Sequence, residues 1–346
     1  KVSMTTHERP GVYSSYDAST VVSGRGGGRT VGIAAISTGG TAGTLHHITR
    51  TEDAVAQFGS KDHLTALIRA LFLNGAGAVT AVPVGAESGY AAAFAALATE
   101  ENLAVITCDS TTLTVQQALR ESIKTAAEAR HERIAVVSGA AGETVSQLVT
   151  RAEALNSERM VLVTPESADE KTGAAAAATA GTIAGERDPA VPLGGAELAG
   201  MTGPAVQYSD NELDLLIRGG VTPLERIGGI VSVVRGVTTR TKTGTAADST
   251  WRELSTILIV DEVIPAIRDA LRAKFQRAKN TEQSRGAVRA QVVLELENRV
   301  AREIIDRYEN VTVAADAADP TVCVVEFSFA VVHGMNQIWM TAHIKV

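Results

Sequence analysis

Cysteine and aromatic residues are scarce in this chain of 346 residues. The two cysteines, Cys108 and Cys323, stand in strand-like apolar runs far apart in the sequence. They predict two buried, reduced thiols and exclude a disulfide framework. Aromatic residues make up only 4% of the chain, so few rings are present to stack on bases or to line a ligand pocket.

An excess of basic charge is also missing. The formal net charge of −7 argues against a general nucleic-acid-binding protein, which would concentrate lysine and arginine on one face. No apolar run reaches the length that crosses a membrane, and the first residues lack the charged region and apolar core of a signal peptide. We therefore expect a protein made in the cytoplasm, without nucleic acid as a partner and without direct membrane insertion.

Motifs of catalysis and metal binding are absent as well. The sequence contains no GxSxG, HExxH or CxxC motif. His46 and His47 are adjacent, so they do not point at one metal ion, and we place them on a surface loop. Asp109-Ser110 follows a predicted strand but has no identifiable histidine partner, and we interpret it as a turn or helix cap. The sequence predicts no catalytic residue, no metal and no cofactor.

A glycine-rich segment near the start does not have the position of a phosphate-binding loop. It comprises Gly24, Gly26, Gly27 and Gly28 and precedes the apolar strand predicted at residues 31–37. A dinucleotide-binding loop must instead follow a strand and open a helix, so that helix N–H groups meet the phosphates. We interpret these glycines as a flexible hinge.

Most of the chain alternates strand-like and helix-like segments, which predicts an α/β fold with a mostly parallel sheet covered by helices. The predicted strands are residues 31–37, 79–84, 103–108, 133–138, 160–163, 221–224 and 230–235. The predicted helices are residues 62–74, 90–98, 115–130, 143–155, 173–185 and 211–218. The fifth helix, almost entirely alanine, glycine and threonine, is expected to pack closely on a neighbour. Residues 238–249 are expected to form a linker or exposed loop.

Two longer helices follow, at residues 254–277, where Pro265 can break the helix, and at residues 288–308. The later part of the first helix is basic, although the chain is acidic overall. Its basic residues are Arg268, Arg272, Lys274 and Arg277. They form either a solvated face with partners one helical turn away or a docking surface for an acidic partner.

The two ends of the chain have the character of exchangeable strands. Alternate residues of the last segment, residues 337–346, are apolar and define one face: Ile338, Met340, Ala342, Ile344 and Val346. Such a strand either pairs within its own domain or adds to a sheet of another copy. Near the other end, Val12, Tyr13, Val21 and Val22 form short β-prone pieces. An extended arm on a glycine hinge suits exchange between subunits.

Several segments, in order and spacing, resemble the contractile phage tail sheath proteins. They are residues 8–13 (ERPGVY), residues 175–188 (AAAATAGTIAGERD), residues 211–220 with the following Val-Thr-Pro-Leu, and residues 257–289 with the closing strand. The similarity is strongest to sheaths of Gram-positive phage and of phage-tail-like bacteriocins, including the clostridial type. It covers nearly the whole chain.

The resemblance implies a division of the chain. Residues 1–29 are the N-terminal arm and hinge, 30–100 a small α/β part, 101–237 the sheath domain called subtilisin-like, 238–336 the C-terminal α/β domain, and 337–346 the exchange strand. The name of the central domain carries no protease activity here, because the sequence offers no Ser-His-Asp set.

The resemblance also implies a structural function. Sheath subunits form stacked hexameric rings around an inner tube and contract without nucleotide hydrolysis. The implied partners are further copies of the chain, the tail tube protein, and baseplate and terminator or collar proteins, in a virion tail or a released phage-tail-like particle. The terminal segments would exchange between subunits, and the basic helix would face the tube. A non-contractile polymerising scaffold and a soluble α/β enzyme are the alternatives.

Overall fold

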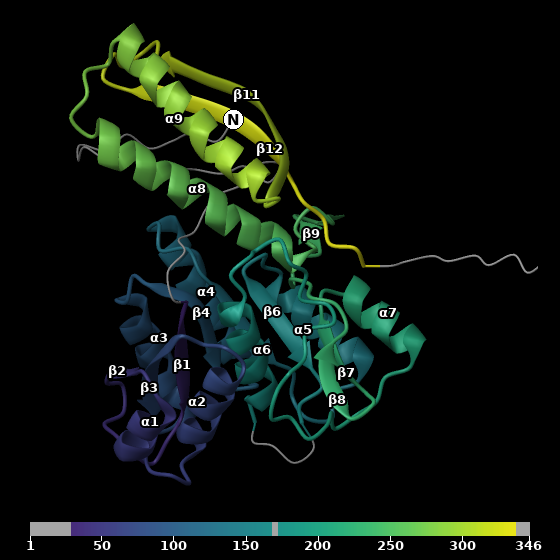
Figure 1. The fold of residues 1–346 in the computed structure, drawn as a ribbon. Helices are drawn as coiled ribbons and strands as arrows, with labels where there is room; N and C mark the ends of the chain where they lie inside the picture. Colours follow the sequence, from purple (N-terminus) through teal and green to yellow (C-terminus); the bar gives the residue numbers. More distant parts are fainter. Residues whose placement is uncertain (1–28, 168–171, 337–346) are drawn as a thin grey trace, which may run out of the picture.

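The computed structural model describes residues 29–167 and 172–336, and its largest feature is an eight-stranded sheet (Figure 1). The strand order is β2-β3-β1-β4-β5-β6-β7-β8. Its strands are β1 (Thr30–Ile36), β2 (His46–Ile48), β3 (Ala78–Val84), β4 (Leu103–Cys108), β5 (Ile134–Ser138), β6 (Met160–Thr164), β7 (Thr222–Ile227) and β8 (Ile230–Val233). The strands from β3 to β7 are parallel, and the edge strands β2 and β8 are antiparallel. The prediction of a mostly parallel sheet is confirmed.

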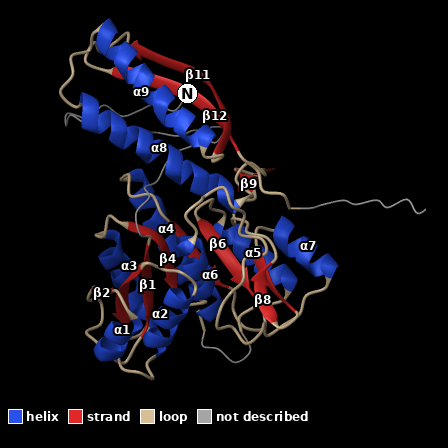
Figure 2. Ribbon diagram, viewed as in Figure 1, coloured by secondary structure: helices blue, strands red, loops and turns tan. Residues whose placement is uncertain are grey.

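The inner strands are short and apolar because helices cover both faces of the sheet (Figure 2). Every residue of β5 and β6 is buried. Helices α1 (Thr51–Phe58), α2 (His63–Leu73) and α6 (Ala174–Gly185) pack on one face. Helices α3 (Tyr90–Ala98), α4 (Leu113–Glu128), α5 (Val145–Leu155) and α7 (Asp210–Arg218) pack on the other, and the short 3-10 helix η1 (Glu87–Gly89) precedes α3.

Helix α6 packs against α2 as closely as its composition predicts. A Cβ added to Gly181 would lie 2.5 Å from the backbone oxygen of Leu71, and one added to Gly185 would lie 3.0 Å from the Cα of Gly75. Real Cβ atoms do not approach a backbone as closely as at Gly181, and a contact of 3.0 Å, as at Gly185, is tighter than most real Cβ contacts, so both positions favour glycine. The small residues of α6 therefore serve packing.

The C-terminal part forms a second layer, in which α8 lies between the eight-stranded sheet and the rest (Figure 1). It comprises α8 (Leu254–Phe275), α9 (Glu282–Ala301) and the antiparallel hairpin of β11 (Ile305–Ala315) and β12 (Cys323–Val331). Helix α8 is continuous with Pro265 inside it. The first half of α8 packs on the core cluster that also contains residues of α2 and α6, and the second half packs with α9 and the hairpin.

Three sequence expectations are corrected here. The helix expected at residues 288–308 begins earlier and ends at Ala301, because Glu303 adopts a left-handed conformation (φ 57°) and the chain continues as β11. His46 and His47 lie on β2, paired with β3, rather than on a loop. Cys108 is buried as expected, and burial raises the pKa of its thiol, but Cys323 is exposed on β12.

Residues 238–249 are not a simple exposed loop. Thr238 and Thr239 are fully buried, and their hydroxyls donate to the backbone oxygens of Trp251 (2.6 Å) and Ser157 (3.1 Å). The segment then forms a small hairpin of β9 (Lys242–Thr243) and β10 (Ala246–Ala247). Threonine looks like loop composition in the sequence, but here its hydroxyls are satisfied by backbone groups.

The sheet runs without a break across residue 100, because β1 lies between β3 and β4. Residues 30–100 and 101–237 therefore share one sheet. Among the described residues, no helix combines the length and the apolar character needed to span a bilayer.

Candidate functional site

The C-terminal hairpin is the element of the described structure that is built to accept further chain. It contains only β11 and β12, and within the described residues neither strand has a second partner. One face is covered, because Phe327 and Phe329 pack toward the core of α8 and α9. A two-stranded ribbon with one covered face leaves two rows of backbone N–H and C=O groups at its edges, and such edges pair with added strands.

The two edges of the hairpin differ. Strand β11 has register shifts between Ile305 and Arg307 and between Glu309 and Thr312, and Asn310 adopts φ 55°. Bulges twist a strand and interrupt its pairing. Strand β12 pairs residue by residue through each stretch between these shifts. Its one charged side chain is Glu326, whereas β11 exposes several charged side chains. The regular edge belongs to β12.

The described residues that follow β12 leave the hairpin and do not turn back along it. After Val331 it runs past β9 and away from the hairpin (Figure 1), and Gly334 reaches the core loop. A Cβ added there would lie 2.7 Å from the Cβ of Pro192. The described residues after β12 therefore contact the loop at Pro192.

The predicted exchange and hinge residues lie outside the described residues. They are Val12, Tyr13, Val21, Val22, Gly24, Gly26, Gly27, Gly28, Ile338, Met340, Ala342, Ile344 and Val346. Their predicted roles remain predictions.

The basic helix is only partly the surface that the sequence suggested. Arg272 and Lys274 are exposed residues on the last turn of α8, and Arg277 is exposed just after the helix ends. Arg268 is not, because its side chain is 8% exposed and its two terminal nitrogens contact the carboxylate oxygens of Glu132 at 2.8 and 2.9 Å. The sequence spacing placed Arg268 with the other three, but the buried acid that pairs with it comes from a distant loop. Arg268 is therefore a packing residue in this structure.

A second buried ion pair joins α8 to the sheet. Arg159, just before β6, contacts the two carboxylate oxygens of Asp261 at 2.7 and 3.0 Å. Burial raises the pKa of Asp261 to about 7, and the neighbouring Arg159 opposes that shift. Glu132 likewise stands just before β5. Two bidentate pairs thus fix α8 at the amino ends of two central strands, in addition to its apolar contacts.

The carboxyl edge of the parallel sheet, where α/β enzymes place their sites, is filled by internal contacts. Asp109 is buried at the end of β4 and accepts hydrogen bonds from the backbone N–H of Ile36 (3.1 Å), from His63 Nε2 (2.9 Å) and from the hydroxyl of Tyr90. Burial, and then the charge of Asp109, raise the pKa of the Tyr90 hydroxyl.

His63 is thus the histidine partner that the sequence did not reveal. It starts α2, and only the fold brings it to Asp109. Ser110 donates its hydroxyl to Glu87 at 2.7 Å and does not face His63. In the described part of the chain, no hydroxyl or thiol is hydrogen-bonded to His63, so the pair lacks the nucleophile of a triad.

The N-terminus of α6 lies at the same edge and is also occupied. The Glu166 carboxylate accepts from the backbone N–H groups of Gly173 (2.7 Å) and Ala175 (2.6 Å). Burial raises the pKa of Glu166, and these hydrogen bonds oppose the shift. The helix dipole and N–H groups that would bind a phosphate are used by the protein's own carboxylate. Within residues 29–167 and 172–336, no group of three or more His, Cys, Asp or Glu side chains is placed to hold a metal ion.

The described structure combines an α/β body, whose sheet edge is filled by internal contacts, with a peripheral two-stranded hairpin. Two family models match the chain. Residues 85–239 match the phage tail sheath protein central domain, and residues 246–345 match the phage tail sheath C-terminal domain. Together these matches cover most of the chain, and the chain belongs to the phage tail sheath protein family.

Solved structures share the whole fold at low sequence identity. A chain of the anti-feeding prophage baseplate is 16% identical with a TM-score of 0.75, covering 99% of this chain and all of that one. A chain of the contracted sheath complex of the extracellular contractile injection system PVC is 17% identical with a TM-score of 0.73, covering 99% of each. The sheath tail protein of Desulfitobacterium hafniense is 12% identical with a TM-score of 0.70, covering 93% of this chain and all of that one. No curated protein matches the chain.

Proposed function

We propose that this chain is the repeating subunit of a contractile sheath, which assembles as stacked hexameric rings around an inner tube and contracts to drive that tube through a cell envelope. The observation that carries the proposal is the two-stranded hairpin with a regular open edge, left by a chain that runs away from it. Family membership and the likeness to sheath and baseplate assemblies support it.

Strand β12 is the proposed acceptor. Residues 337–346 of one subunit would pair along the free edge of β12 in another subunit, with the face of Ile338, Met340 and Ile344 turned toward α8 and α9. Each backbone hydrogen bond contributes about 0.5–1.5 kcal/mol net, so a row of them links subunits firmly. The N-terminal segment with Val12, Tyr13, Val21 and Val22 would add a further strand.

The exposed basic residues at the end of α8 are the proposed contact with the tube. Arg272 and Arg277 are exposed, and Lys274, also an exposed residue, donates a hydrogen bond from Nζ to Gln291 Oε1 on α9. Exposed ion pairs contribute only about 0–1 kcal/mol each. Contacts of this strength can be broken one ring after another during contraction, while the backbone pairing between subunits persists. Arg268 takes no part in this surface.

The energy of contraction would be stored at assembly, so the subunit needs neither nucleotide nor catalytic residues. The buried pairs that fix α8 support movement of the described parts as one body. The glycines from Gly24 to Gly28 would supply the flexibility of the arm. Tube, baseplate and collar proteins are the remaining proposed partners, and a virion tail or phage-tail-like particle is the proposed location. The domain limits inferred from the sequence, including 238–336 and 337–346, are part of this proposal.

Substitutions on alternate residues of the last segment test the proposed strand pairing. Ile338→Asp and Ile344→Asp place charge on the face that would be buried, whereas Thr341→Asp and His343→Asp place the same charge on the opposite face. We expect each of the two isoleucine variants to lose high-molecular-weight assembly in sedimentation, and the Thr341 and His343 variants to keep it. Equal assembly by all four single variants would show that the segment does not pair as an alternating strand.

A further inference from the structure

The loop at residues 186–196 is where the sheet, the C-terminal layer and the chain beyond β12 meet. Ala190 is buried and belongs to the apolar core of α8 and α9, whereas Leu193 packs against the core of the eight-stranded sheet. The ring of Pro192 lies against Gly334, which follows β12. One loop therefore touches all three parts of the described chain.

Hydrogen bonds hold this loop at both ends. Near its start, the carboxylate of Asp188 accepts the backbone N–H of Ala190 at 2.9 Å. Near its end, the N–H of Gly195 donates to the backbone oxygen of Val233 on β8 at 2.7 Å. Pro192 stands between these two anchors, and its ring fixes its φ. The loop is thus attached to the edge strand of the sheet and keeps a defined shape.

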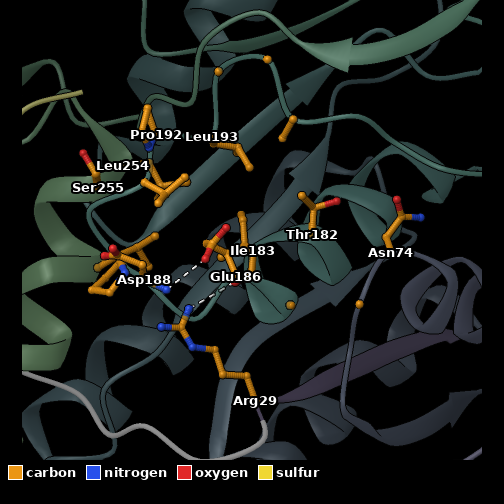
Figure 3. A pocket seen from close by; sticks show the side chains of 18 residues that line it. Arg29, Asn74, Thr182, Ile183, Glu186, Asp188, Pro192, Leu193, Leu254 and Ser255 are labelled. Atoms are coloured by element: carbon orange, nitrogen blue, oxygen red, sulfur yellow. Dashed lines mark hydrogen bonds between the residues drawn. The ribbon is translucent and has the colours of Figure 1, made fainter. Parts of the chain in front are cut away.

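The middle of the loop borders a cavity of about 500 Å³ (Figure 3). In this view Pro192 and Leu193 lie near Leu254 and Ser255, at the start of α8. Because space remains beside these loop residues, close packing alone does not fix them. The position of the Pro192 ring depends on the hydrogen-bonded ends of the loop and on the fixed φ of proline.

The contact with Pro192 leaves no room for a side chain at position 334. A Cβ added to Gly334 would lie 2.7 Å from the Cβ and 2.8 Å from the Cγ of Pro192. Gly334 does not adopt a positive φ, so its backbone conformation would accept alanine. The need for glycine comes from the proline ring, whose atoms cannot rotate away as the end of a flexible side chain would.

Gly334 stands between the end of β12 and Asn336, the last described residue. Fixing the backbone of one residue costs about 1–2 kcal/mol of conformational entropy. A chain that is already seated at Gly334 has lost part of this freedom before it pairs with anything. Preorganisation of this kind strengthens an association without adding a contact to the partner.

We propose that Pro192 is a positioning residue for strand donation: it seats Gly334 and so fixes the point from which residues 337–346 leave the subunit. The inference rests on the proposed function, because it assigns a role in the pairing of that last segment with another copy. The seat itself is made entirely of residues 186–196 and Gly334, so its existence is tested in the separate subunit.

A disulfide tests the seat without assembly. Pro192→Cys and Gly334→Cys, in a Cys323→Ser background, place two thiols at the contact. Disulfides have Cβ atoms about 3.5–4.5 Å apart, and the chain at position 334 need only move outward slightly to reach this separation. We expect an intramolecular disulfide, detected by mass spectrometry at a concentration where size-exclusion chromatography shows a monomer. The control pair Gly85→Cys and Gly334→Cys should stay reduced, because Gly85 follows the carboxyl end of β3, at the other end of the sheet.

Sedimentation of single and combined variants tests the positioning role. Gly334→Ala should raise the concentration needed for assembly about tenfold, because the added methyl group moves the chain off the proline ring. Pro192→Gly removes the ring atoms that this methyl group meets, so the combined variant should assemble at a lower concentration than Gly334→Ala alone. Two independent structural defects would add instead. Gly85→Ala is the matched control, since its Cβ would make an ordinary contact at 3.7 Å, and it should assemble like the unmodified protein.

Two results would overturn the inference while leaving the proposed function intact. One is the absence of the disulfide between positions 192 and 334, and the other is assembly of Gly334→Ala at the same concentration as the unmodified protein. Circular dichroism verifies that each variant is folded. If the disulfide forms but the unmodified protein never assembles, the proposed function is wrong and the positioning role is lost with it.

Discussion

The buried contact between Arg268 and Glu132 permits a quantitative test of how the C-terminal layer is attached. Both side chains are less than one tenth exposed, and the pair is bidentate. Removing one partner of such a pair leaves an uncompensated charge in a low-dielectric site and costs about 3–5 kcal/mol. We therefore expect Arg268→Met alone, and Glu132→Leu alone, each to lower the free energy of unfolding by about this amount.

The double variant should behave differently. With both charges replaced by apolar side chains of similar volume, neither charge is left without the other, and stability should return to within about 1 kcal/mol of the original or exceed it. Urea denaturation followed by the fluorescence of Trp251, which is buried where the chain enters α8, measures all four proteins at a concentration below that of assembly. Trp339 should be replaced by Phe in every protein so that only one indole reports.

The control is an exposed pair of the same chemistry. Arg218 and Asp214 on α7 lie 2.9 Å apart with about two thirds of each side chain exposed, so Arg218→Met should cost no more than about 0.5 kcal/mol. If Arg268→Met costs as little as Arg218→Met, the side chain is not buried against Glu132. The original interpretation of Arg268 as a surface residue would then be restored.

Three further predictions concern single positions. Gly181→Ala should lower stability by about 1–3 kcal/mol in urea denaturation, because its Cβ would meet the backbone oxygen of Leu71; Gly286→Ala on α9, with open space around it, should instead raise stability by up to about 1 kcal/mol. Hydrogen bonds from neighbouring threonines lower the pKa of Asp248 to about 2. The ionised carboxylate therefore stabilises its turn above the unfolded pKa of about 3.9, and this stabilisation is lost as the pH falls through 2; a carboxyl NMR titration midpoint near 4 would contradict it. Asp109→Ala should cost about 2 kcal/mol or more, because it leaves a buried N–H and a buried hydroxyl unpaired, and unchanged urea stability would refute the internal role assigned to this acid.

The alternating part of the fold could be predicted because burial on both faces of a parallel sheet leaves a plain signature: short apolar strands separated by amphipathic helices. The sequence predicted the wrong structure in segments whose conformation depends on tertiary contacts. Thr238 and Thr239 read as loop residues until backbone acceptors are placed beside them. Residues 305–308 were predicted as helix because nothing local marks the left-handed turn at Glu303.

The partners of buried charged residues also could not be predicted from the sequence. Arg272 is exposed on the last turn of α8 and Arg277 is exposed just beyond it, but the sequence could not exclude Arg268 from this group, because its partner Glu132 is 136 residues away in the chain. His63 and Asp109 are 46 residues apart and meet only because α2 begins at the end of β1 and β4. Pairs of this kind have no signature in a single sequence, whereas the alternation of the last segment and the glycines of the arm are visible directly.

The measurement that tests the central claim most directly is electron microscopy of the purified full-length protein beside a variant that lacks residues 337–346. The account predicts helical tubes built from rings for the full-length chain, and unassembled subunits that keep the same circular dichroism spectrum for the truncated one. A full-length protein that stays monomeric at high concentration, or tubes that form equally well without residues 337–346, would contradict assembly through strand donation.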